Sequence, residues 1–249
     1  MSIAPLSAVD RRQAEVLGVK VDLATMDETV AHLDALLQSD SPHIVATADA
    51  SGIYMAQKDP ELAEIYAQAS HVTADSYGVV WALRRKGIDT PRVSGVDVAD
   101  RLIALSAQKG YRVYLLGAAP GVPEAAAERL RLLHPGCNIV GTRHGYFPAR
   151  DDQVVAEEVA KAEPDILLVA MGIPRQEKFI RATQSVIRAK VAVGVGGSFD
   201  VWSGRAKRAP VLIQKMKLEW LWRLLLNPKK ISKAKTLPRF AWRVLKSGR

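Results

Sequence analysis

The sequence predicts an α/β protein: a three-layer domain with a mostly parallel sheet, followed by a basic helical C-terminal appendage. Three observations lead to this prediction. Short apolar runs alternate with amphipathic helical patterns up to about residue 200, which is the order of parallel βαβ units. The chain has 249 residues, 48% of them hydrophobic, which is enough for one large domain. From residue 201 onward there are 14 Lys and Arg but a single acid, Glu219.

The first half of the chain begins with 15 residues that show no periodicity, and we expect residues 1–15 to be flexible. Apolar periodicity then predicts strands and helices in alternation. Pro60 favours a helix start, and Gly110 a helix end. The predicted elements are a strand at 16–21, a helix at 26–38, a strand at 43–48, helices up to 56 and over 60–69, a strand from 71, a helix through 81–86 and a helix ending at 110.

The second half repeats the alternation more plainly. Residues 112–117 form a continuous apolar run, typical of a strand covered on both faces. Further predicted elements are a helix to about 133, a strand at 139–141, a helix at 151–162, a strand at 165–170, a helix at 175–188 and a strand at 191–195. Together with the first half, these elements predict a Rossmann-like core over residues 16–209.

Residues 210–249 differ in character from the core. The run 211–226 is apolar nearly all round, and between 237 and 245 apolar residues recur at helical spacing with basic residues off that face. This pattern predicts a basic amphipathic helix. The charge would suit nucleic acid or an anionic membrane, but the tryptophans Trp220, Trp222 and Trp242 favour a membrane interface.

Cysteine content and hydropathy indicate the compartment. The one cysteine, Cys137, lies in a strand-like run and is expected to pack in the core of a protein from a reducing environment. The longest uncharged stretch has eleven residues, 113–123, too few to span a bilayer, and no signal sequence is visible at the N-terminus. We therefore expect a cytoplasmic protein that attaches peripherally to the inner face of the cell membrane.

Several familiar sites are missing from the sequence. There is no P-loop, no H-E-x-x-H and no paired Cys/His spacing for zinc. The glycine run from Gly194 has Phe199 where a dinucleotide fingerprint needs its third glycine. No two aspartates lie two residues apart, so the D-x-D that binds a divalent metal in many sugar transferases is absent. The residues predict no metal site and no bound cofactor.

Three glycine-containing loops follow predicted strands, at 117–121, 171–177 and 194–197. Glycine lets backbone N–H groups approach a ligand, and a helix N-terminus favours an anion. Any one of these loops is explained as well by a tight turn. Because carboxyl ends of parallel strands lie at one edge of a sheet, the three loops together with Thr47 and Asp75 favour a nucleotide-like ligand.

Asp75 follows the strand-like run at 71–74 and precedes a helical pattern. A carboxylate at the carboxyl end of a parallel strand is well placed for catalysis, because ligands bind in the crevice there. Aspartate at such a junction more often caps the next helix by accepting backbone N–H bonds. From the residues alone, both roles are open and the cap is the commoner.

Six sequence blocks point to a known family. They are Thr-Ala-Asp-Ser-Tyr-Gly-Val-Val-Trp (73–81), Arg-Val-Ser-Gly-Val-Asp (92–97), Gly-Ile-Pro-Arg-Gln-Glu (172–177), Gly-Val-Gly-Gly-Ser-Phe-Asp (194–200), Arg-Ala-Pro (208–210) and Leu-Glu-Trp-Leu-Trp-Arg-Leu (218–224). In this order they resemble the WecG/TagA/CpsF glycosyltransferases, glycosyltransferase family 26, from about residue 17 to 228. The resemblance implies inverting, metal-independent transfer of a sugar from a UDP-sugar to a saccharide on a polyprenyl diphosphate, in the synthesis of cell-surface polysaccharides.

The resemblance also implies roles for single residues. Asp75 becomes the general base that takes the proton of the acceptor hydroxyl, and Thr47 lies near the sugar site. Asp49 stands where many members have Asn, and Ser76 replaces the usual Gly after the aspartate. A departure whose effect the sequence does not reveal is Lys217, where the family usually has Gly.

Further substrate-binding residues follow from the matched blocks. Gln176 and Glu177 are expected to bind donor or acceptor hydroxyls, or to cap their helix in a role rated equally. Arg208 and Arg223 are expected to neutralise the diphosphate, or to be basic surface positions. The remaining expected substrate-binding residues are Gly117, Gly172, Gly196, Gly197, Phe199 and Asp200.

The expected partners are a UDP-sugar donor, a polyprenyl-diphosphate-linked saccharide, an anionic membrane surface bound through the tail, and further copies in a homo-oligomer, without nucleic acid. Two alternatives remain at this point. One is an NAD-dependent enzyme that modifies nucleotide sugars; the other is a non-enzymatic basic adaptor that binds membrane or nucleic acid.

Overall fold

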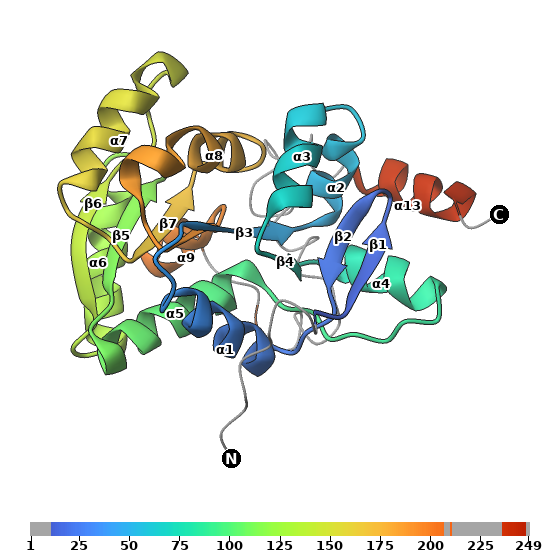
Figure 1. The fold of residues 1–249 in the computed structure, drawn as a ribbon, viewed down its shortest axis with the longest axis horizontal. Coiled ribbons are helices and arrows are strands. Elements are labelled where there is room, and N and C mark those ends of the chain that lie inside the picture. Colours follow the sequence, from blue (N-terminus) through green and yellow to red (C-terminus); the bar gives the residue numbers. More distant parts are fainter. Residues whose placement is uncertain (1–10, 207–209, 211–235, 248–249) are drawn as a thin grey trace.

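A computed structural model describes residues 11–206, 210 and 236–247. Its centre is a six-stranded sheet in which every neighbouring pair is parallel (Figure 1). The predicted α/β class is confirmed, and the sheet is parallel throughout. In spatial order the strands are β4 (His71–Ala74), β3 (His43–Ala48), β8 (Val191–Gly194), β7 (Ile166–Ala170), β5 (Arg112–Gly117) and β6 (Asn138–Arg143).

Helices cover both faces of the sheet, which makes the three layers. One face is covered by α2 (Ala50–Ala56), α3 (Pro60–Gln68), α4 (Tyr77–Arg85), α7 (Asp152–Ala160) and α8 (Arg175–Ile187), and α13 (Thr236–Ser247) adjoins the helices on this side. The other is covered by α1 (Met26–Leu36), α5 (Gly95–Lys109), α6 (Val122–Leu133) and α9 (Ser198–Trp202). A 3-10 turn, η1 (Ala149–Asp151), precedes α7.

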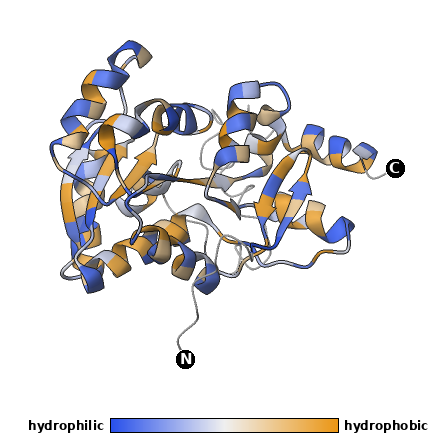
Figure 2. Cartoon of the chain, viewed as in Figure 1, coloured by the Kyte–Doolittle hydropathy of each residue, from blue (hydrophilic) through white to orange (hydrophobic). Residues whose placement is uncertain are grey.

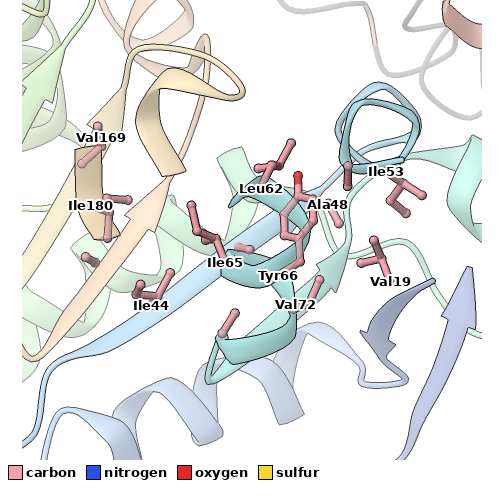
Figure 3. Close-up of a cluster of buried hydrophobic side chains, with 14 of the residues drawn as sticks. Val19, Ile44, Ala48, Ile53, Leu62, Ile65, Tyr66, Val72, Val169 and Ile180 are labelled. Atoms are coloured by element: carbon pink, nitrogen blue, oxygen red, sulfur yellow. The ribbon is translucent and has the colours of Figure 1, made fainter. Parts of the chain in front are cut away.

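Each strand divides its side chains between the two apolar layers, because successive residues point to opposite faces. In β5, Tyr114 and Leu116 join one buried cluster while Val113 and Leu115 join the other. The helices show the matching pattern, with hydrophobic sides toward the sheet and hydrophilic sides outward (Figure 2). Figure 3 shows part of one of the two clusters, with side chains from the strands and from α2, α3 and α8.

Helix ends follow the signals in the sequence. Asp59 accepts a hydrogen bond from the Leu62 N–H at 3.2 Å, and Pro60 occupies the first turn of α3 as predicted. Gly110 ends α5 with a φ of 79°, in the left-handed region that favours glycine.

Residues 16 and 19–21 lie in strands as predicted, but the prediction of one continuous strand at 16–21 is wrong. The chain forms a hairpin instead, β1 (Gln13–Val16) and β2 (Val19–Asp22), which pairs antiparallel outside the main sheet. Leu17 and Gly18 make the turn with positive φ values of 49° and 81°. The hairpin also takes in residues 13–15, which the sequence assigned to the flexible lead-in.

Asp22 attaches this hairpin to the sheet. Its carboxylate accepts from Arg11 Nη2 at 2.6 Å and from the backbone N–H of Val72 in β4 at 2.7 Å. Burial opposes ionisation of Asp22, but the contacts with Arg11, His71 and Val72 outweigh it and lower its pKa.

The C-terminal helix α13 packs on α2 and α4. Phe240 and Val244 are 2% and 7% exposed and belong to the same buried cluster as those helices, whereas Trp242 and Leu245 are 59% and 47% exposed. The apolar side that the sequence assigned to a membrane is therefore divided, and part of it packs against the domain. The predicted apolar run at 211–226 lies outside the described residues.

Candidate active site at the carboxyl edge of the sheet

The carboxyl ends of β4, β3, β8, β7 and β5 are neighbours along one edge of the sheet. This order brings the predicted residues after β4 and β3 next to the glycine loops after β8, β7 and β5. The expectation that these segments meet at a single edge is confirmed. Two acidic residues lie at this edge, Asp49 directly after β3 and Asp75 directly after β4.

Asp75 is half-buried and is fixed by contacts from two other segments. Its backbone N–H donates to the Ala48 carbonyl of β3 at 3.2 Å. Its carboxylate Oδ1 accepts from the Gly95 N–H at 2.8 Å, at the first residue of α5. A carboxylate beside a helix N-terminus is stabilised by the N–H groups and the helix dipole. Asp75 thus caps a helix that lies 20 residues further along the chain.

Ser76, rather than Asp75, caps the helix that directly follows. Its hydroxyl accepts from the Val79 N–H at 3.4 Å and from the Ala50 N–H of α2 at 3.1 Å. The alternative role of Asp75 as the cap of α4 is therefore wrong. The departure from the family pattern at Ser76 gains a structural explanation, because its hydroxyl ties the starts of α2 and α4 together.

Thr47 packs next to Gly95, the residue whose N–H binds Asp75. Its side chain is buried, and Oγ1 donates to the Gly194 carbonyl of β8 at 2.7 Å. A methyl group on Gly95 would lie 2.7 Å from Thr47 Cγ2, so only glycine lets α5 approach closely enough for its N–H to reach Asp75. Thr47 therefore positions the partner of Asp75 by packing against Gly95, and it is itself fixed by its hydrogen bond to Gly194.

Asp49 is half-buried at the start of α2. Its Oδ1 accepts from the Gly52 N–H at 2.7 Å, which is a standard helix cap. Behind it lies Tyr66 of α3, whose hydroxyl would clash with any side chain at position 52. Burial first, and then the carboxylates of Glu177, Asp49 and Asp75, raise the pKa of Tyr66 well above its ordinary value.

Gln176 joins two of the glycine loops. Its side chain is 1% exposed, and Oε1 accepts from the N–H groups of Gly172 and Gly196, both at 3.0 Å. Its Nε2 donates to Glu177 Oε1 at 2.8 Å, and Glu177 is also 1% exposed. Two of the N–H groups expected to face a ligand are thus used to hold the loops. The roles of Gln176 and Glu177 in binding sugar hydroxyls stay predictions.

The other predicted residues of these loops serve packing or lie at the edge of the site. Gly117 has a φ of 135°, and a methyl group there would lie 2.5 Å from the Ala170 backbone. Phe199 is fully buried and stacks on Trp202 with ring centroids 5.9 Å apart. Gly197 is exposed just before α9, and Asp200 is half-buried within it. Their substrate contacts stay predictions.

The family model named "Glycosyl transferase WecG/TagA/CpsF family" matches residues 14–249. The chain belongs to the WecG/TagA/CpsF glycosyltransferase family. Similar proteins include "N-acetylglucosaminyldiphosphoundecaprenol N-acetyl-beta-D-mannosaminyltransferase" from the Staphylococcus aureus strains MRSA252, NCTC 8325 and COL. Each is 32% identical over 240 residues, which cover 95% of this chain and 94% of the relative. The resemblance seen in the sequence is confirmed, and the chain is a glycosyltransferase.

Membership of the WecG/TagA/CpsF family decides between the alternatives. A glycosyltransferase is neither an NAD-dependent sugar-modifying enzyme nor a non-enzymatic adaptor. In keeping with this, the buried Phe199 occupies the position where a dinucleotide fingerprint needs glycine. Among the described residues, no group of three His, Cys, Asp or Glu is arranged to bind a metal ion.

Sequence reasoning missed three members of this WecG/TagA/CpsF site. Gly95 was visible only as part of a matched block, and its contact with Asp75 joins distant segments. Nothing in the sequence marks Tyr66 or Gly52 as part of the site. An aromatic residue on the apolar side of a helix, such as Tyr66, is typical of a hydrophobic core. Arg208 and Arg223, predicted to contact the diphosphate, lie outside the described residues.

Proposed function

We propose that this WecG/TagA/CpsF enzyme moves a sugar from a UDP-sugar to a saccharide carried by a polyprenyl diphosphate, with inversion and without a metal ion. The reaction would serve cell-surface polysaccharide synthesis. The names of the S. aureus relatives, which describe transfer of N-acetylmannosamine to a lipid-linked N-acetylglucosamine, support both the donor sugar class and the acceptor class. N-Acetylmannosamine, glucose and glucuronic acid are the donor sugars considered.

The observation that carries this proposal is the setting of Asp75. It stands at the carboxyl end of β4, half-buried, with one carboxylate oxygen bound to the Gly95 N–H at 2.8 Å. The contact fixes the carboxylate in orientation while leaving part of the side chain accessible. General base catalysis needs this combination of a held carboxylate and access for the substrate.

In the proposed reaction, Asp75 accepts the proton of the acceptor hydroxyl as its oxygen attacks the anomeric carbon. The UDP oxygen departs from the opposite face, so the configuration at that carbon inverts. A positioned base contributes about 10²- to 10⁴-fold in rate. The leaving diphosphate carries negative charge that cationic side chains would neutralise, and we assign this role to Arg208 and Arg223.

Replacement of Asp75 by Ala tests the proposal directly. We expect transfer from a UDP-sugar to a polyprenyl-diphosphate saccharide by the wild-type enzyme in the presence of EDTA, and a loss of about 10²- to 10⁴-fold in kcat in the variant. Initial rates measure the effect, and a thermal melt checks the fold. Full activity of Asp75→Ala would remove Asp75 as the base, and abolition of wild-type activity by EDTA would contradict the metal-free reaction.

We also propose that the enzyme works at the cytoplasmic face of the membrane, as a peripheral protein attached through its basic tail. The described helices include none long and apolar enough to cross a bilayer. In α13, the exposed Trp242 and Leu245 stand among the exposed basic residues Arg243 and Lys246. Exposed aromatic and aliphatic side chains beside basic ones suit an anionic membrane interface.

Flotation with anionic vesicles tests this attachment. Changing Trp242 and Leu245 together to Ala should weaken binding about fivefold, because the apolar contribution of α13 is removed while its charge remains. The matched control changes Leu132 and Leu133 of α6, 73% and 53% exposed, and should leave binding unchanged. Equal binding by all three proteins would exclude α13 from the membrane contact.

A further inference from the structure

Asp49 has more hydrogen-bonding capacity than the helix cap uses. Within the described part of the chain, the one hydrogen bond to its carboxylate comes from the Gly52 N–H and is accepted by Oδ1. Its side chain is half-buried, so part of the carboxylate is accessible. An ionised carboxylate accepts hydrogen bonds only, and its second oxygen therefore suits the O–H groups of a ligand.

Tyr66 gives an independent sign that a polar ligand or water belongs here. Its side chain is 2% exposed, and its hydroxyl has no hydrogen-bond partner among the described residues. Figure 3 shows the hydroxyl oxygen at the end of the Tyr66 ring. A methyl group on Gly52 would lie 2.4 Å from this oxygen and 3.5 Å from Asp49 Oδ1, so the hydroxyl lies close to the Asp49 carboxylate. A buried O–H without an acceptor costs about 1–3 kcal/mol. We expect it to find its acceptor next to Asp49 when the site is filled.

Asp49 is also close to the proposed base. Ala48 and Ala74 are paired in the parallel register of β3 and β4, and the next residues along are Asp49 and Asp75. Neighbouring strands lie about 4.8 Å apart. A sugar that presents its hydroxyl to Asp75 therefore brings its ring, or the ring of its reaction partner, within reach of Asp49.

We propose that Asp49 makes the sugar subsite beside Asp75 selective for uncharged sugars over uronic acids. This inference rests on the proposed function. Ring hydroxyls donate to the Asp49 carboxylate, and charge-assisted bonds of this kind are stronger than neutral ones. The carboxylate of a uronic acid has no proton to donate and is repelled by the like charge. At a separation of about 6 Å near a protein surface, the repulsion amounts to about 100-fold in kcat/KM.

The experiment compares donors that differ only at C6, with a neutral polyprenyl-diphosphate saccharide as acceptor. The pairs are UDP-glucose with UDP-glucuronic acid, and UDP-N-acetylmannosamine with its uronic acid. A second arm keeps the neutral donor and compares a neutral acceptor sugar with its uronic acid. The wild-type enzyme should prefer the uncharged partner by about 100-fold in one arm, and that arm identifies the sugar next to Asp49.

Asp49→Asn removes the charge but keeps a good helix cap, and Asp49→Ser is a second uncharged capping residue. Both should reduce the preference for uncharged sugars at least tenfold without a change in melting temperature. Asp59→Asn, the same change at the cap of α3, is the matched control and should keep the wild-type preference.

Several outcomes would overturn the inference. Equal use of the neutral and acidic partner by the wild type in both arms would do so, as would a preference that survives both Asp49 changes. These results leave the proposed function standing. Failure of the wild type to transfer any sugar from any UDP donor would overturn the proposed function, and this inference with it.

Discussion

The two halves of the site are each held by one side chain that accepts hydrogen bonds from two backbone N–H groups in different segments. At the ends of β3 and β4, Ser76 Oγ accepts from Ala50 and Val79. At the ends of β7 and β8, Gln176 Oε1 accepts from Gly172 and Gly196. The bonding is alike, but Ser76 is half-buried whereas Gln176 is 1% exposed.

This difference in burial separates a region suited to chemistry from one suited to support. Around Ser76, the carboxylates of Asp49 and Asp75 remain partly accessible and can meet a substrate. Around Gln176, polar groups are enclosed and bind one another, as Gln176 Nε2 does with Glu177. A buried polar group needs its partners, because no water can replace them. We therefore expect the hydrogen bonds accepted by Gln176 to contribute more to stability than those accepted by Ser76.

The larger effect is expected for Gln176→Leu. Leucine has a similar size but leaves the N–H groups of Gly172 and Gly196 without their acceptor, at a cost of about 2–5 kcal/mol in the free energy of unfolding. Urea denaturation measures the change. Gln184→Leu makes the same replacement on the same helix at a side chain whose Oε1 has no partner in the described part of the chain, and should cost less than about 1 kcal/mol.

If Gln176→Leu loses no more unfolding free energy than Gln184→Leu, the stabilising role assigned to Gln176 is contradicted. That result would mean that the two glycine loops are held by other contacts. Transfer activity should fall with stability in Gln176→Leu, because the loops that it holds border the proposed site.

The smaller effect is expected for Ser76→Ala. Removing the cap should lower the free energy of unfolding by about 1 kcal/mol, the typical cost of losing a helix N-cap. Transfer should fall severalfold in kcat, because the starts of both helices position Asp49 and Asp75. Ser185→Ala, an exposed serine on α8, serves as the control in the same melting and rate measurements.

A stability loss in Ser76→Ala as large as that in Gln176→Leu would contradict the assigned difference in burial. Unchanged transfer would instead show that Asp49 and Asp75 hold their positions without the shared serine.

Much of the fold could be predicted because strands that are buried on both faces leave a continuous apolar pattern. The predicted strands 43–48 and 112–117 coincide with β3 and β5. The hairpin was missed because its two strands are short and Val16, Val19 and Val21 read as one apolar run. In α13, periodicity identified the apolar residues but not which of them face the domain.

For the site, the sequence is enough to show which residue types follow the strands, and the six matched blocks indicated the family. It placed Asp75 after a strand and before a helix, where a cap and a base look alike. The packing of segments that are distant in the sequence decides that Asp75 binds the Gly95 N–H instead of capping α4. The reason is physical: a cap on the next helix is a local contact encoded by neighbouring residues, whereas the partner of Asp75 is brought to it by the packing of α5 against the sheet.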